Sequence, residues 1–181
     1  MQSLSLSAPD ERMLLHDVAD RLNTVADQLP LTDQIRPDPA LSEILDDEVR
    51  HLARLLGYLV GEHAFRHRAA ARSPTQVTAA QRRTSLALAR AAEPSAAALA
   101  ALGAAVHHLG QLADLTHQAP GPARTQAHTS AYQGLVDRLG ESRTCLARAA
   151  KQLRAAADTR PAPPVTALPP PTATATSSPS R

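Results

Sequence analysis

The sequence predicts an all-α protein, a helical bundle of about five helices followed by a disordered C-terminal tail. Apolar side chains recur three and four residues apart in segment after segment, so they line one face of each predicted helix. Alanine, the best helix former, occurs 37 times and leucine 25 times, whereas phenylalanine and tyrosine together supply three residues. Prolines separate the striped segments. This pattern predicts a leucine and alanine core shared by several packed helices.

The first predicted helix spans residues 9–29. Ser7 precedes Pro9 and Asp10, which is the order of a capping residue, a first-turn proline and an acid that suits a helix N-terminus. Residues 1–8 are expected to be a flexible N-terminus.

The second predicted helix spans residues 39–72, after a loop that contains Pro30 and Pro37, and Asp38 is its expected capping residue. A stripe of positions three and four residues apart runs through this helix, formed by Leu45, Val49, Leu52, Leu56, Leu59 and His63. Because the stripe is long and narrow, two interpretations stay open. The helix is buried inside a single-chain bundle, or it pairs with a helix of another chain as a coiled coil.

Three further helices complete the expected bundle domain, residues 9–158. A weaker helical pattern covers residues 75–92, and the proline within residues 93–95 predicts a restart or a kink. The next helix runs to His117. A turn over residues 119–122 precedes the last helix, residues 123–158.

Residues 159–181 form the predicted tail. Seven of the last 21 residues are proline, and most of the others are threonine, serine and alanine. Such a segment buries too little apolar surface to offset the entropy lost on ordering it, so we expect it to be disordered.

Charge is distributed unevenly along the chain, although the net charge is +2. Residues 1–50 hold 11 acidic residues and 4 arginines, and most of the positive charge follows them. Two interpretations stay open. The acidic and basic parts pack together so that their fields cancel, or a basic surface faces an acidic partner.

The sequence favours a cytoplasmic protein without a membrane segment. Cys145 is the single cysteine, which excludes an intramolecular disulfide and a zinc site of four cysteines. The first dozen residues lack the features of a signal peptide. The longest apolar run, residues 96–106, has 11 residues, about half of the ~20 that cross a bilayer.

No constellation of residues predicts a catalytic, metal or cofactor site, and no small-molecule substrate is evident. Glu48 and His51 form one Glu-x-x-His pair, but di-iron bundles need this pair on two helices, so we expect a solvated flank. His63 occupies an apolar stripe position, where we expect a bond to a nearby carbonyl or carboxylate; a pH-sensitive contact is the alternative. His108 is expected to project away from the stripe of its helix.

Two surfaces are candidates for binding. Gly57 and Gly61 lie four residues apart beside Tyr58 and Phe65, and small residues at this spacing let another helix approach closely. Tolerated glycines on a solvated face would give the same pattern. The second candidate is a stretch without acidic residues whose arginines suit phosphate contacts, although arginines near helix ends are also ordinary dipole partners: Arg66, Arg68, Arg72, Arg82, Arg83 and Arg90.

We therefore expect a non-enzymatic protein-interaction or assembly module that binds a protein partner or a second copy of itself. The alternative is a small nucleic-acid-associated or regulatory protein that uses the Arg66 to Arg90 surface. The acidic, basic and nucleophilic groups are scattered along the sequence, which argues against an enzyme. A helix-turn-helix spacing and stacking aromatic residues are both missing, which weighs against direct reading of bases.

Overall fold

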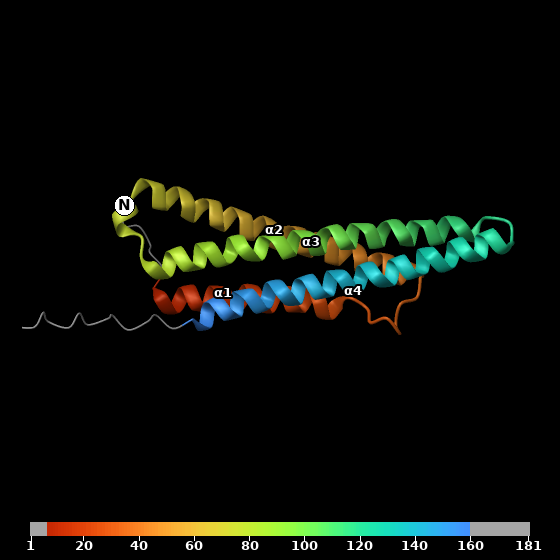
Figure 1. Ribbon diagram of the computed structural model, residues 1–181, viewed down its shortest axis with the longest axis horizontal. Helices are drawn as coiled ribbons and strands as arrows, with labels where there is room; N and C mark the ends of the chain where they lie inside the picture. The colour runs from red at the N-terminus through yellow and green to blue at the C-terminus, as the bar shows by residue number, and fades with distance from the viewer. Residues whose placement is uncertain (1–6, 160–181) are drawn as a thin grey trace, which may run out of the picture.

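The computed structural model describes residues 7–159, which form four α-helices and one short 3₁₀ helix and contain no strand (Figure 1). The elements follow one another as α1 (Ala8–Gln28), α2 (Pro39–Arg72), the 3₁₀ helix η1 (Pro74–Gln76), α3 (Ala79–Thr116) and α4 (Pro122–Asp158). The all-α prediction is confirmed, and so are the bounds predicted for the second helix.

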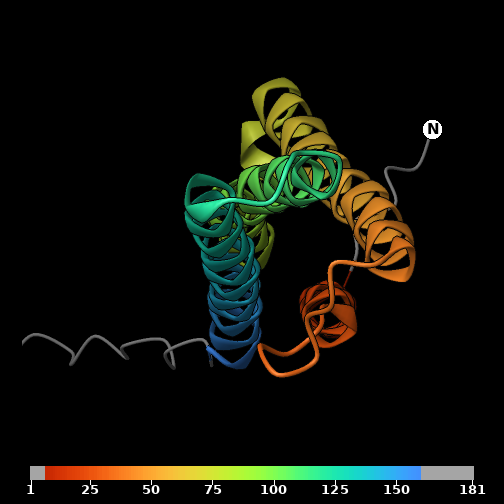
Figure 2. The ribbon, with the colours of Figure 1, turned by 90° about the vertical axis from the view of Figure 1, so that its right-hand side faces the viewer.

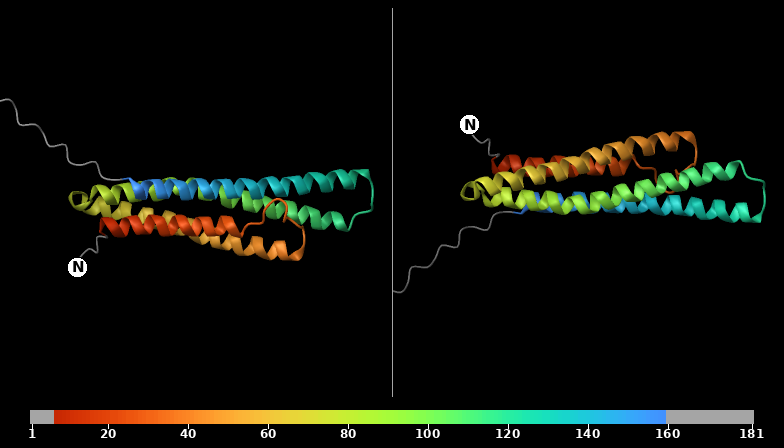
Figure 3. Two further views of the ribbon diagram at one scale, coloured as in Figure 1. Left: turned by 90° about the horizontal axis from the view of Figure 1, so that it is seen from below. Right: turned by 90° about the horizontal axis from the view of Figure 1, so that it is seen from above.

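The helices run up and down, each antiparallel to the one before it (Figures 1 and 3). The view along the bundle in Figure 2 places α1 beside α2 and α4, and α3 beside the same two helices. The most extensive packing is between α3 and α4, and α1 packs on α4 more extensively than on α2. Within residues 7–159, the backbones of α2 and α4 do not meet, so these two helices form one diagonal of the bundle.

The hairpins are offset along the bundle axis. The α3–α4 hairpin extends beyond the α1–α2 loop at one end, and the α2–α3 turn extends beyond the end of α4 at the other (Figures 1 and 3). The α1–α2 loop lies against α4, where the Tyr132 hydroxyl donates to the Ile35 carbonyl at 3.2 Å and Arg143 donates to the Leu29 carbonyl at 3.0 Å. These bonds fix the loop on the bundle.

Side-chain caps determine where the helices begin. Ser7 and Asp10 form a reciprocal capping box at the start of α1, and the bonds from Ser7 lower the pKa of Asp10. A second box joins Thr78 to Gln81, with the Thr78 amide 2.9 Å from the Gln81 amide oxygen. The second box explains why α3 begins at Ala79, whereas the sequence pattern predicts a start near residue 75.

The prediction of about five helices is wrong for the described residues, because the expected break at residues 93–95 does not occur. Pro94 lies inside the continuous helix α3 and is buried. A proline there removes the hydrogen bond to the Arg90 carbonyl, at a cost of about 3 kcal/mol in an exposed helix. The burial of Pro94 inside the bundle offsets this cost. The adjacent Ser95 is fully buried, and its hydroxyl donates to the Ala91 carbonyl at 2.8 Å.

Leucine and alanine build the core, as predicted. Fully buried alanines on α3 and α4 allow close approach of the two backbones, and Cys145 is also buried. The largest fully buried side chains come from all four helices and from the loop after α1: Leu22, Leu29, Leu45, Leu52, Leu59, Leu88, Leu102, Leu135, Leu139, Leu146 and Leu153.

Polar contacts hold α1 on both sides. Glu11 pairs with Arg66 of α2 at 2.7 Å, and Asp20 pairs with Arg154 of α4 at 2.7 Å. The acidic first helix is thus set between two basic neighbours, so part of the charge asymmetry is compensated inside the bundle.

Two predicted segments extend outside the described residues, namely the N-terminus before Ser7 and the tail after Thr159. Within the described part, α3 alone is long and apolar enough, by length and composition, to cross a membrane. A mostly buried core helix passes the same test; here α3 packs on α2 and α4, and 28% of its most apolar window is buried.

Candidate interaction surface

Gly57, Tyr58, Gly61 and Phe65 share the outward side of α2, which we call the aromatic face. The side chains of Tyr58 and Phe65 are 41% and 61% exposed. A β-carbon added to either glycine would meet nothing within 4 Å. No described helix covers Gly57, Gly61 or Phe65, so the spacing of the two small residues is not used inside the bundle.

The aromatic face points outward because the opposite side of α2 carries the buried leucines. At 100° per residue, Leu52, Leu55 and Leu59 lie on one side of the helix and Gly61 and Phe65 on the other. The core therefore determines the direction in which the aromatic face points.

Positive charge surrounds the aromatic face. Arg54, Arg68 and Arg72 are exposed, and none forms an ion pair within residues 7–159. Partial burial and the nearby Glu62 carboxylate raise the pKa of Tyr58. The charges of Asp17 and Arg21 on α1 also act on the Tyr58 hydroxyl, which places this ring at the border between α1 and α2.

Arg66 does not belong to an open basic surface, contrary to the prediction. Its side chain is 11% exposed, and one terminal nitrogen lies 2.7 Å from both oxygens of Glu11. Its Nε donates to Glu62 at 2.8 Å. Burial opposes the charged form of Arg66, but the bonds to Glu11 and then Glu62 outweigh it and raise the pKa. The sequence spacing shows Glu62 as a neighbour but gives no sign of Glu11, which is 55 residues away.

The other predicted phosphate contacts remain accessible in part. Arg68 and Arg72 close α2, and Arg82 and Arg83 lie in the first turns of α3, so all four are near the α2–α3 turn. The Arg82 guanidinium donates to the Val77 carbonyl at 3.0 Å. Arg90 is exposed two turns further along α3.

His63 forms the carbonyl bond that its stripe position predicts. Its Nδ1 lies 3.1 Å from both the backbone carbonyl and the hydroxyl of Ser85 on α3. The ring of His67 is 6.2 Å away between centroids. His63 therefore lies at the partly buried border between α2 and α3, with the exposed His67 beside it.

Glu48 is buried, whereas the sequence pattern predicts a solvated flank. The residue is 8% exposed, because it points into the leucine stripe between Leu45 and Leu52. Its Oε2 has no hydrogen-bond partner, and the Nδ1 of His51 is 3.9 Å away. Burial raises the pKa of Glu48. Residues 7–159 contain no group of three potential ligands that could hold a metal.

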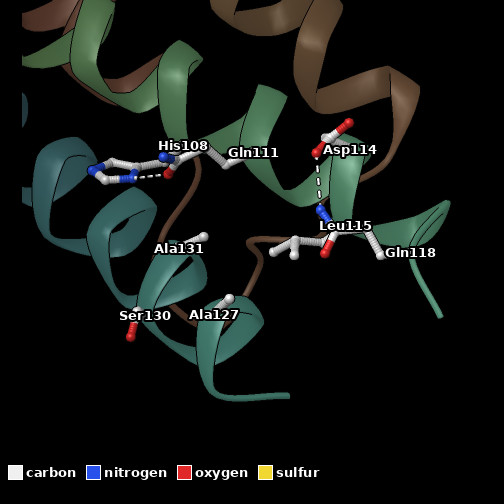
Figure 4. A pocket seen from close by; sticks show the side chains of 8 residues that line it. All are labelled: His108, Gln111, Asp114, Leu115, Gln118, Ala127, Ser130 and Ala131. Atoms are coloured by element: carbon white, nitrogen blue, oxygen red, sulfur yellow. Dashed lines mark hydrogen bonds between the residues drawn. The ribbon is translucent and has the colours of Figure 1, made fainter. Parts of the chain in front are cut away.

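A hollow of about 430 Å³ lies between α3 and α4 near their connecting turn (Figure 4). The polar side chains on its α3 side bond to one another: His108 Nδ1 lies 3.0 Å from Gln111, and Gln118 donates to Asp114 at 3.0 Å. A β-carbon at Gly134 would lie 2.6 Å from the His108 ring. The missing side chain of Gly134 therefore leaves room for the half-buried imidazole to pack against α4. The hollow has a floor of leucine and alanine and few free polar groups.

The aromatic face therefore stands out as an exposed, largely apolar surface, bordered by arginines that form no ion pair within residues 7–159. Comparisons of this chain with protein-family models, with curated proteins and with solved structures find no match, so its surfaces are interpreted from their own geometry.

Proposed function

We propose that this chain is a non-enzymatic protein-interaction or assembly module that presents the aromatic face of α2 to another protein chain. The observation that carries the proposal is the placement of its aromatic residues. The single phenylalanine and one of the two tyrosines lie exposed on this face, while the buried core is aliphatic. Aromatic side chains contribute most when they are buried, and they are enriched in protein interfaces.

The glycines of the aromatic face support the same proposal. A glycine inside a helix costs about 1 kcal/mol relative to alanine, a residue that is abundant in this chain. Neither Gly57 nor Gly61 has a positive φ or a close neighbour that requires it. A partner helix that approaches α2 closely would use both positions.

Pairing of helices between chains, the coiled-coil interpretation, is restricted to the outward side of α2 in this proposal. The leucine stripes of α2 and α4 are buried within the chain, so helix pairing between chains would use the outward side of α2 instead. The aromatic face provides small and apolar residues at positions 57, 61 and 65, each four residues from the next along the helix.

The titratable groups with shifted pKa values favour a non-enzymatic role. The pKa of Asp10 is shifted by its helix cap, and the pKa values of Glu48 and Tyr58 are shifted by burial. The pKa of Arg66 is shifted by its ion pairs with Glu11 and Glu62. None of the four lines the hollow between α3 and α4. An active site gathers such groups in one concave place.

The test compares the full chain with two variants, Phe65→Glu and Leu86→Glu, in affinity purification from the native host at moderate salt with nuclease. Leu86 is a matched control, because it is 49% exposed on α3, outside the aromatic face. We expect a defined protein to be retained by the wild type and by Leu86→Glu, and reduced about tenfold or more by Phe65→Glu, because hot-spot aromatics dominate interfaces. Equal recovery with all three proteins would contradict the proposal.

A second candidate function is nucleic-acid contact through the arginines of the α2–α3 turn. The observation that favours it is that Arg68, Arg72, Arg82 and Arg83 lie close to this turn, on two elements that extend past the end of α4. Clustered arginines bind phosphates without sequence preference.

A further inference from the structure

We propose that the occupant of the aromatic face is α1 of a second copy of this chain. This inference rests on the proposed function and names the partner for the same surface. The two copies are related by a two-fold axis parallel to the bundle, so that α1 of each copy packs on the aromatic face of the other.

The outward side of α1 complements the aromatic face in charge and in shape. Asp10, Met13, Asp17 and Arg21 are spaced three and four residues apart, so they form one stripe along the helix. Met13 is 69% exposed, more than any other large apolar residue in residues 7–159. Both aspartates are exposed beside it; Asp17 pairs with Arg21 at 3.0 Å, so the negative charge that no arginine pairs lies at Asp10. The aromatic face, in contrast, is bordered by unpaired arginines.

Contacts within the chain fix the register between the two stripes. Glu11 bonds Arg66, and α1 runs antiparallel to α2, so residues before Arg66 lie level with residues after Glu11. Met13 is therefore level with Phe65. Asp17 and Arg21 act on the Tyr58 hydroxyl, which agrees with the same register.

The two-fold axis carries this register into the contact between copies. Rotation about an axis parallel to the bundle exchanges the places of α1 and α2 without shifting them along the bundle. Met13 then faces Phe65 of the other copy, and Asp10 faces Arg68 of the other copy. Asp17 is level with Gly61 of the other copy, where the missing side chain leaves room for α1. Each contact occurs twice, as in any isologous interface.

Charge favours a two-fold axis parallel to the bundle over one perpendicular to it. An axis perpendicular to the bundle would set α1 against α1 and α2 against α2, which brings aspartates to aspartates and arginines to arginines. The parallel axis sets the α1 stripe, whose unpaired charge is that of Asp10, against the arginines of α2 at both contacts. Opposite charges across an interface direct the register of association.

The test measures the mass of the full chain by sedimentation velocity from about 1 to 100 μM, a range that covers dissociation constants of weak dimers. We expect the wild type and Leu86→Glu to reach twice the chain mass of 19.1 kDa. Phe65→Glu and Met13→Arg should each raise the dissociation constant about tenfold or more, since the glutamate is placed beside Asp10 and Asp17 of the other copy and the arginine beside Arg68 of the other copy. Both positions are exposed, so circular dichroism should show unchanged helix content.

The combination Met13→Arg/Phe65→Glu is the decisive variant, because the two introduced charges are opposite and face each other across the proposed interface. We expect it to regain the dimer that each single substitution loses. A wild type that stays monomeric at about 100 μM would overturn the inference, as would a double variant no better than the singles. A monomeric wild type that still loses its co-purified protein on Phe65→Glu would leave the proposed function intact with a different partner.

Discussion

Glu48 is a carboxylate in a row of leucines, and its protonation links the stability of the bundle to pH. Because burial raises the pKa of Glu48 above its usual 4.5, the folded state binds this proton more tightly than the unfolded state. The folded state is therefore penalised as the pH rises above about 4.5, where the unfolded chain ionises. Below that pH, both states hold the proton and the penalty disappears.

We expect Glu48→Met to stabilise the protein at pH 7 by about 1–3 kcal/mol, because it removes a buried oxygen without a partner. Urea unfolding at pH 7 and at pH 4 measures the change, and the gain should shrink at the lower pH. Glu43→Met is the matched control, since Glu43 is exposed on the same helix and its loss should stay within about 0.5 kcal/mol. An equal gain at both pH values would show that the pKa of Glu48 is the same in the folded and the unfolded states.

At the scale of the elements, one buried ion pair joins the first helix to the second. Glu11 is 3% exposed, and one terminal nitrogen of Arg66 donates to both oxygens of its carboxylate at 2.7 Å. Since α1 packs on α2 less extensively than on α4, this pair is a principal contact at that border. Removing one partner of such a pair strands the other charge in the interior.

We expect Arg66→Met to destabilise the protein by about 3–5 kcal/mol, because Glu11 is left buried and unpaired. The double variant Glu11→Met/Arg66→Met should recover most of this loss, since it removes both charges. Equilibrium unfolding of the four proteins in a double-mutant cycle gives the coupling energy. Additive losses in the double variant would mean that the two side chains contribute independently.

Helix positions could be read from the sequence because each depends on neighbours along the chain. The caps at Ser7 and Asp38 and the leucine stripes predict the starts and the buried sides of α1 and α2 within one or two residues. Pro94 misled the prediction, because its local signal is that of a helix end and the packing that overrides it comes from other helices.

The candidate site could be predicted in part. Spacing alone identified Gly57, Gly61 and Phe65 as one side of α2, and the structure leaves that side uncovered. The fate of Arg66 could not be predicted, because its partner Glu11 is distant in sequence and meets it only after the two helices pack. The burial of Glu48 was equally hidden, since a polar residue at the edge of a stripe favours a solvated interpretation.

For the whole molecule, the placement of charge separates the two candidate functions. The acidic α1 is partly compensated by Arg66 and Arg154, whereas the arginines near the α2–α3 turn include several without an ion pair in residues 7–159. We call the region of Arg68, Arg72, Arg82 and Arg83 the basic end of the bundle. A basic surface whose charge is not compensated attracts polyanions in a salt-dependent manner.

If the basic end binds nucleic acid, Arg82→Glu/Arg83→Glu should abolish the binding of a labelled duplex at low salt, measured by fluorescence anisotropy, because both phosphate contacts become repulsive. The same variant should keep the association that depends on Phe65. Arg148→Glu/Lys151→Glu is the control, because it makes the same change in net charge on exposed positions of α4. Equal losses in the two variants would trace the binding to net charge and not to this end of the bundle.

The two tyrosines give the molecule a pair of built-in optical reporters, since it has no tryptophan. Tyr58 stands on the aromatic face, whereas Tyr132 donates to Ile35 and reports the seating of the α1–α2 loop on α4. With Tyr132→Phe, all tyrosine emission comes from the aromatic face; with Tyr58→Phe, all of it comes from the loop contact. Unlabelled protein can therefore distinguish the covering of α2 by another chain from a rearrangement of the loop, by intrinsic fluorescence alone.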